Sequence, residues 1–186
     1  MHDALSDEQL MLQYKGGDTQ AFEVLYSRYR HPLFRYLQHQ SGNAAIAEEL
    51  FQDIWMNLIR ARDRYEVTAS FKTFIYRMSH NRLIDYYRKN KHGIPTSYDE
   101  HDELLNLEQN ANTVSPQRTV EGLEQIEQLI NIIEALPEAQ REAFLLKENS
   151  GLSVEEIAEI TNTKPETAKS RIRYALRKIR EVIDLE

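Results

Sequence analysis

The sequence predicts an all-helical protein made of two small domains. Its hydrophobic content of 41% is sufficient for packed cores. Only 6 Gly and 5 Pro occur in 186 residues, and no stretch alternates apolar and polar residues as a half-buried strand would. Cysteine is absent, which excludes disulfides and thiolate metal sites.

Four helices are expected in the first domain, residues 1–93. A capping box at Ser6 begins a short helix, and Asp18 can cap a longer one. After Gly42, apolar residues recur at helical spacing through Ala47, Leu50, Phe51, Ile54, Trp55 and Leu58. Ser70 is the expected N-cap of a helix that runs to about Lys91.

Residues 94–122 are predicted to be an acidic linker. Within them, residues 94–120 contain two prolines and a net charge of −4. The helical period returns at Leu123, which opens the second domain, residues 123–186.

The second domain contains a predicted helix-turn-helix. Capping boxes begin at Ser153 and, ten residues later, at Thr163. Two capped helices joined by so short a turn must cross. The inner stripe of the second helix leaves polar and basic residues outward or flanking, which are types that contact bases and phosphates: Thr167, Lys169, Ser170, Arg171, Arg173, Tyr174 and Arg177.

The charge is distributed very unevenly along the chain. The total is −7, yet residues 60–91 and residues 164–180 each carry +6. Because nucleic-acid binding depends on local potential, the two basic segments indicate two anion-binding surfaces. In the first of them, Thr73, Arg77, Asn81, Asp85 and Arg88 share one helix face among aromatic residues, a combination that suits single-stranded DNA.

The whole chain resembles the extracytoplasmic-function (ECF) sigma factors of the sigma-70 family. The resemblance rests on motifs in the family's order, among them the segments 47–55, 71–85, 136–138 and 151–158. It implies an initiation factor, not an enzyme, that binds RNA polymerase core at the clamp helices of its largest subunit. It also implies recognition of the promoter −10 element by sigma region 2 and of the −35 element by sigma region 4, and no catalytic residue, metal or cofactor is expected.

The resemblance assigns residues to each surface. The −35 candidates are Lys147, Thr167, Lys169, Ser170, Arg171, Arg173, Tyr174 and Arg177. The −10 candidates are Tyr65, Ser70, Lys72, Thr73, Arg77, Asn81, Asp85 and Arg88. Glu48, Glu49, Gln52 and Asp53 would contact the polymerase. Many relatives have Gly-Thr-Val where this chain has Glu166-Thr167-Ala168, so base preference does not transfer.

Partners and location follow from the same resemblance. Promoter DNA and an anti-sigma factor are expected partners, and no segment has the length and apolarity of a membrane span or a signal peptide. We therefore expect a cytoplasmic protein, which an anti-sigma factor can hold at the membrane.

Two other functions compete with this interpretation. A stand-alone helix-turn-helix regulator explains residues 153–180 but not the aromatic and basic helix before the linker. A metal hydrolase would use the pairs His2-Asp3 and His101-Asp102, but neither pair has a second cluster at ligand spacing.

Overall fold

A computed structural model describes residues 2–90 and 121–183. Within these ranges the protein is entirely helical, as predicted. Two short 3₁₀ turns, His2–Ala4 and Arg62–Arg64, accompany the helices α1 (Asp7–Lys15), α2 (Thr19–Ser41), α3 (Ala44–Ala61), α4 (Phe71–Asn90), α5 (Glu121–Ala135), α6 (Glu138–Glu148), α7 (Val154–Ile160) and α8 (Pro165–Ile183). The predicted linker 94–122 lies almost wholly outside the described residues.

The starts of α1, α2, α4 and α7 follow the capping signals in the sequence. Ser6 and Ser153 each form a complete capping box, with Gln9 and Glu156 respectively. Asp18 accepts hydrogen bonds from the first turn of α2. The Ser70 hydroxyl accepts a hydrogen bond from the Thr73 N–H at 3.0 Å, so α4 also begins where predicted.

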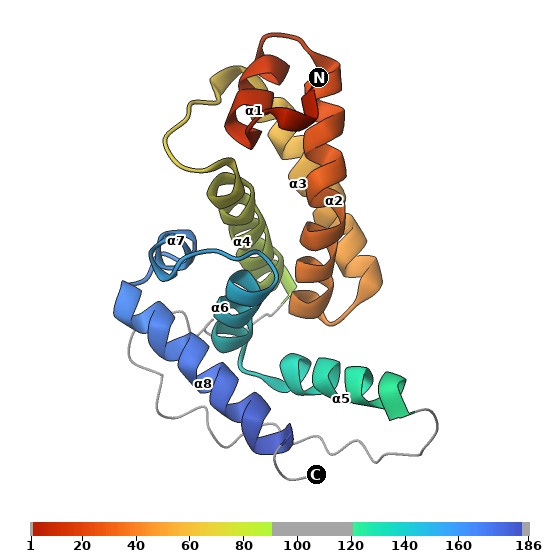
Figure 1. The fold of residues 1–186 in the computed structure, drawn as a ribbon, viewed down its shortest axis with the longest axis vertical. Coiled ribbons are helices and arrows are strands. Elements are labelled where there is room, and N and C mark those ends of the chain that lie inside the picture. The colour runs from red at the N-terminus through yellow and green to blue at the C-terminus, as the bar shows by residue number, and fades with distance from the viewer. Residues whose placement is uncertain (1, 91–120, 184–186) are drawn as a thin grey trace.

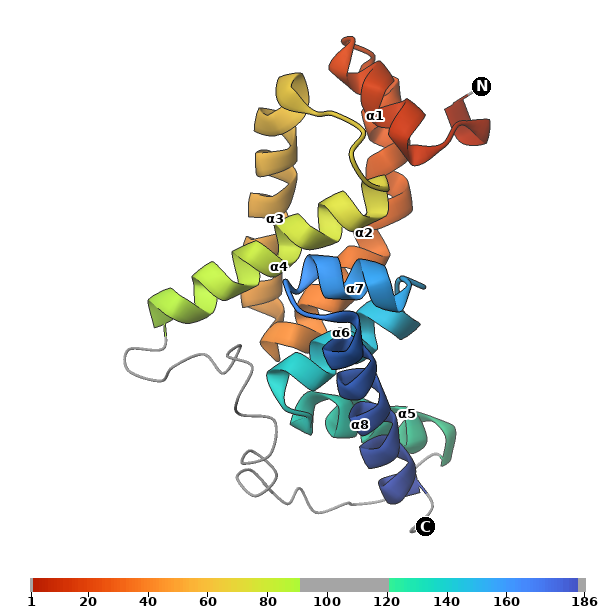
Figure 2. The same ribbon diagram turned by 90° about the vertical axis from the view of Figure 1, so that its left-hand side faces the viewer.

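The N-terminal helices α1 to α4 share one aliphatic and aromatic core. Helix α2 packs on α1 and α3, and α3 packs on α4 (Figures 1 and 2). Trp55 is 5% exposed and contacts the rings of Phe22, Tyr26 and Phe51, so it is a core residue. This core fixes the axes of α3 and α4, the two helices that carry most of the candidate residues before the linker.

The C-terminal helices are organised around α8. It packs against α6 and α7 and also touches α5. Ala168, Ile172, Ala175 and Ile179, four of the residues predicted for the inner stripe, are buried at intervals of three or four residues, and Leu176 of the same stripe is half-buried. The turn between α7 and α8 holds Asn162 in the left-handed conformation, at φ 52°.

Helices from the two ends of the chain lie side by side. Helix α7 lies against α4, and α6 and α5 contact α2 (Figures 1 and 2). The two predicted domains are therefore in direct contact, and this arrangement decides which candidate residues are open to solvent.

Candidate nucleic-acid interface

Helix α8 presents an open basic face. Lys169, Arg173 and Arg177 are exposed, while the opposite side of the helix is buried. The guanidinium groups of Arg173 and Arg177 lie 5.3 and 5.0 Å from the centre of the Tyr174 ring. These cation–π contacts limit the rotamers of both arginines and so hold two positive charges along one line.

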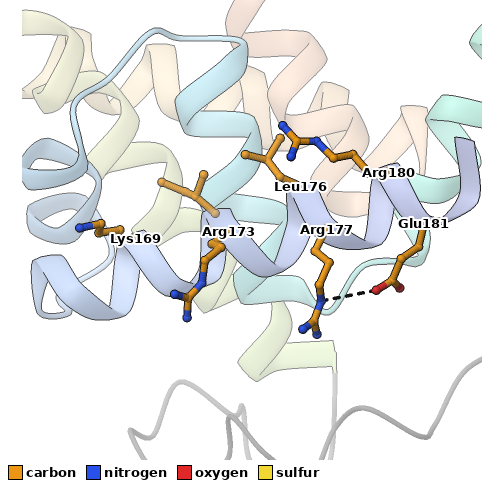
Figure 3. A pocket seen from close by; sticks show the side chains of 7 residues that line it. Lys169, Arg173, Leu176, Arg177, Arg180 and Glu181 are labelled. Atoms are coloured by element: carbon orange, nitrogen blue, oxygen red, sulfur yellow. Dashed lines mark ion pairs between the residues drawn. The ribbon is translucent and has the colours of Figure 1, made fainter. Parts of the chain in front are cut away.

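A shallow groove of about 610 Å³ runs along this face (Figure 3). Ile172 and Leu176 form its apolar floor, and its rim is basic except for Glu181. Figure 3 shows Arg177 turned towards Glu181, and the two side chains form an ion pair with a 3.5 Å separation. Positive charges spaced along one helix match the phosphates of a duplex better than they match a small anion.

Arg171 was expected on the outward or flanking side of α8, as a residue that contacts DNA, but it is almost fully covered. It is only 6% exposed, although it belongs to the same helix as the open face. Its charge helps to lower the pKa of the buried carboxyl group of Glu142. Thr167 and Ser170 are half-buried, and the ammonium of Lys147 donates to the Leu152 carbonyl at 3.3 Å. The open part of the predicted −35 set is therefore centred on Lys169, Arg173 and Arg177.

The predicted −10 face on α4 is divided into two halves. Its C-terminal half is open, because Asn81, Asp85 and Arg88 are exposed. Its N-terminal half is covered by α7 and the turn before it. Thr73 is 1% exposed there, and Arg77 forms an ion pair with Glu159.

Tyr65, one of the predicted −10 residues, is buried among aromatic rings and is not part of an open surface. It is 4% exposed and contacts Phe71 and Phe74 edge-to-face. Its hydroxyl has no hydrogen-bond partner, and burial raises its pKa to about 12. In this conformation a flipped-out base would have to displace packed side chains to reach Tyr65.

The acidic face of α3 is open. Glu48, Glu49 and Gln52 are exposed, whereas Asp53 accepts a hydrogen bond from the Arg82 Nε at 2.8 Å. This bond ties α3 to α4, and Arg82 Nη2 also forms an ion pair with Glu49 Oε1 at 3.9 Å. Glu48, Glu49 and Gln52 are nevertheless exposed on the surface, where a partner can reach them.

Comparison with known proteins identifies both halves of this arrangement. The family model for Sigma-70 region 2 matches residues 25–93, and the model for Sigma-70 region 4 matches residues 126–179. The chain belongs to the ECF sigma factors. It is 30% identical over 187 residues to the ECF RNA polymerase sigma-E factor of Escherichia coli strain K12, covering 99% of this chain and 95% of that protein.

Other relatives agree over nearly the full length. The factor SigW of Bacillus subtilis strain 168 is 31% identical, over 89% of this chain and 92% of that one. Among solved structures, CnrH in complex with the cytosolic domain of CnrY has a TM-score of 0.69 at 18% identity, covering 97% and 98% of the two chains. The sigma factor RpoE bound to the anti-sigma factor NepR from Bartonella quintana has 0.67 at 22%, covering 89% and 98%. These two likenesses support the fold.

Membership of this family gives the chain the function of a transcription initiation factor. This sigma factor directs promoter-specific transcription initiation through its region 2 and region 4 domains, and it binds RNA polymerase core and promoter DNA. A stand-alone regulator is excluded, because such a protein would lack region 2. Sigma factors are not enzymes, so the metal-hydrolase alternative is wrong as well.

The described residues contain neither a cluster of possible metal ligands nor a helix suited to crossing a bilayer. His2 pairs with Asp18 at 2.8 Å, and no group of three or more possible metal ligands occurs in the described part of the chain. The pair His101-Asp102 lies outside the described residues. Between residues 2–90 and 121–183, no helix combines the length and apolarity that crossing a bilayer requires.

Proposed function

We propose that α8 recognises the −35 element of the promoter from the major groove. The observation that carries this is the open row of Lys169, Arg173 and Arg177, which begins just after the turn between α7 and α8. In a helix-turn-helix, the N-terminal residues of the second helix reach the base edges. Thr167, Lys169 and Ser170 occupy those positions, while Arg173, Tyr174 and Arg177 lie further along, where phosphates pass.

The companion proposal is that α4 recognises and opens the −10 element. Asn81 can pair with a base edge, and Arg88 supplies positive charge on the same open surface. Ser70, Lys72, Thr73 and Arg77 would extend this surface towards the start of the helix. We also propose that Glu48, Glu49 and Gln52 meet basic groups on the polymerase, and that Asp53 mainly orients Arg82.

An anti-sigma factor is a proposed partner. Two solved structures with a similar fold are complexes: CnrH with the cytosolic domain of CnrY, and the sigma factor RpoE with the anti-sigma factor NepR. We propose that this chain works in the cytoplasm, where the polymerase and the chromosome are, and that such an inhibitor can retain it at the membrane.

Run-off transcription on a library of genomic fragments tests these proposals. We expect core polymerase with this protein to start transcripts at a defined set of promoters that share −10 and −35 sequences. Core polymerase alone is the control. Transcripts with no shared upstream sequence would contradict the assignment of recognition to α4 and α8.

Tyr65→Phe separates a functional role of the Tyr65 hydroxyl from a structural one. Because this hydroxyl is buried without a partner, we expect its removal to raise the free energy of unfolding by about 1 kcal/mol. If the hydroxyl also contacts a flipped-out base, promoter melting will fall despite the gain in stability. Thermal unfolding and permanganate footprinting of unpaired thymines measure the two effects, and unchanged melting would remove the hydroxyl from the −10 site.

A further inference from the structure

A pocket of about 240 Å³ lies where region 2 and region 4 meet. Residues of α1, α2 and α4 form one side of it, and the turn between α6 and α7 forms the other. A water molecule takes up about 30 Å³, so the pocket has room for several waters or for one small ligand. Of its lining residues, only Lys72 belongs to the surfaces proposed above for DNA and the polymerase.

Two hydroxyls in the lining of this pocket have no hydrogen-bond partner among the described residues. They belong to Tyr76 on α4, which is 1% exposed, and to Ser150 in the turn, which is 7% exposed. Burial raises the pKa of Tyr76, and the nearby Ser150 hydroxyl and the charge of Arg35 act in the opposite direction. The two hydroxyls are thus neighbours, but their geometry is not that of a hydrogen bond. Buried polar groups without partners destabilise a protein, so this pair calls for an occupant that supplies the partner.

Two cations line the same pocket. Arg28 donates to Asp7 Oδ1 at 2.5 Å, and the second oxygen of Asp7 accepts a hydrogen bond from the Tyr29 hydroxyl. Lys72 donates to the Ser150 carbonyl at 2.9 Å. Arg28 therefore balances the charge of the one carboxylate in the lining, and the ammonium of Lys72 leaves one net positive charge.

The side chains of the lining offer more hydrogen-bond donors than free acceptors. Both oxygens of Asp7 already accept hydrogen bonds, whereas the hydroxyls of Tyr76 and Ser150 and the amide of Asn149 can each donate. An ammonium has three N–H groups, so Lys72 can donate to a ligand as well as to the turn. A phosphate group complements this set, because it carries a charge of roughly −1.5 to −2 near neutral pH and several strong acceptor oxygens.

We propose that this pocket binds a phosphate-sized oxyanion between Lys72, Tyr76 and Ser150, with Arg28 as the second positive charge at the site. The oxyanion is either free phosphate or the phosphate group of a small metabolite, since both present the same oxygens. Because the lining comes from both regions, the affinity for the anion is linked to the contact between them. The proposal does not depend on promoter recognition, and its test contains neither polymerase nor DNA.

The first experiment is an amide NMR titration of the full chain with inorganic phosphate and, separately, with methyl phosphate. Sodium chloride at equal ionic strength is the reference. We expect saturable shifts of the Asn149 and Ser150 signals, and the ligand with the lower Kd identifies the source of the oxyanion. The exposed basic face of α8 is the rival anion site. Shifts confined to Lys169 and Arg173, or no saturable shift at all, would overturn the proposal.

Substitution of Lys72 tests the charge at the site. We expect Lys72→Gln to weaken phosphate binding at least about tenfold, because a charge-assisted hydrogen bond is lost. Lys89→Gln is the matched control, since it removes the same charge from an exposed position on the same helix. The control should keep the parental affinity. Equal affinities in the two variants would place the anion outside this pocket.

The hydroxyls are tested by Tyr76→Phe combined with Ser150→Ala. Tyr86→Phe combined with Ser27→Ala deletes the same two groups outside the pocket and is the control. Without phosphate, the pocket variant should unfold roughly 2–4 °C above the parent, because two buried groups without partners are gone. Phosphate should raise the unfolding temperature of the parent and the control, but not that of the pocket variant. An equal rise in all three proteins would indicate a general salt effect and would overturn the proposal.

Discussion

Lys169→Ala combined with Arg173→Ala should abolish promoter-specific transcription while leaving polymerase binding intact. Both side chains are exposed on the open face of α8, so their removal should not affect folding. Each lost contact should cost about 1–3 kcal/mol, so the pair should weaken promoter binding by the assembled polymerase at least about thirtyfold. Arg171 is unsuitable for this experiment because it is buried near Glu142, and its removal would change the inter-region contact as well.

The measurement is promoter binding and run-off transcription with reconstituted holoenzyme. The single variants Lys169→Ala and Arg173→Ala are measured beside the double variant, and Arg30→Ala, which removes a charge from an exposed position on α2, is their control. Circular dichroism checks folding, and co-purification checks polymerase binding. If the double variant no longer bound polymerase, the division of labour between the regions would be wrong.

Glu48→Lys combined with Glu49→Lys should prevent assembly with the polymerase, the step that the substitutions on α8 leave intact. Both residues are exposed on α3 and would face basic groups on the proposed partner. Placing like charges against each other costs several kcal/mol, so affinity for core polymerase should fall at least about a hundredfold. The loss should shrink at high salt, because exposed charges are screened.

A fluorescence titration of labelled protein with core polymerase measures this effect. Glu23→Lys combined with Glu148→Lys applies the same change of charge at exposed positions on α2 and α6. The control should retain assembly. Equal losses in both variants would indicate a general effect of charge and would move the docking surface away from α3.

The helices and their ends were predictable because their causes are local. A Ser, Asp or Asn side chain caps the N–H groups two or three residues ahead, and such signals stand in the sequence at Ser6, Asp18 and Ser153. The inner stripe of α8 was predictable for the same reason, since burial at helical spacing is visible in the chain itself.

Arg171 and Tyr65 show where this reasoning stops. Helical spacing placed Arg171 on the flank of the stripe, but which flanking residues are covered depends on the helices that pack there. Tyr65 was expected on the −10 surface, yet it is buried against the rings of Phe71 and Phe74. Neither outcome has a local signal. The same holds for Glu142, which one sequence cannot distinguish from the exposed acidic residues around it.

The sequence by itself determined the helical class, the two basic segments and the family, because composition, periodicity and motif order are properties of the chain. Only the tertiary structure decided that the two regions lie against each other, with Glu142 held by Tyr36 and His80 across 106 and 62 residues of sequence. Contacts at such separations depend on how whole helices pack. For that reason the open and covered halves of the −10 surface could be distinguished only once the fold was known.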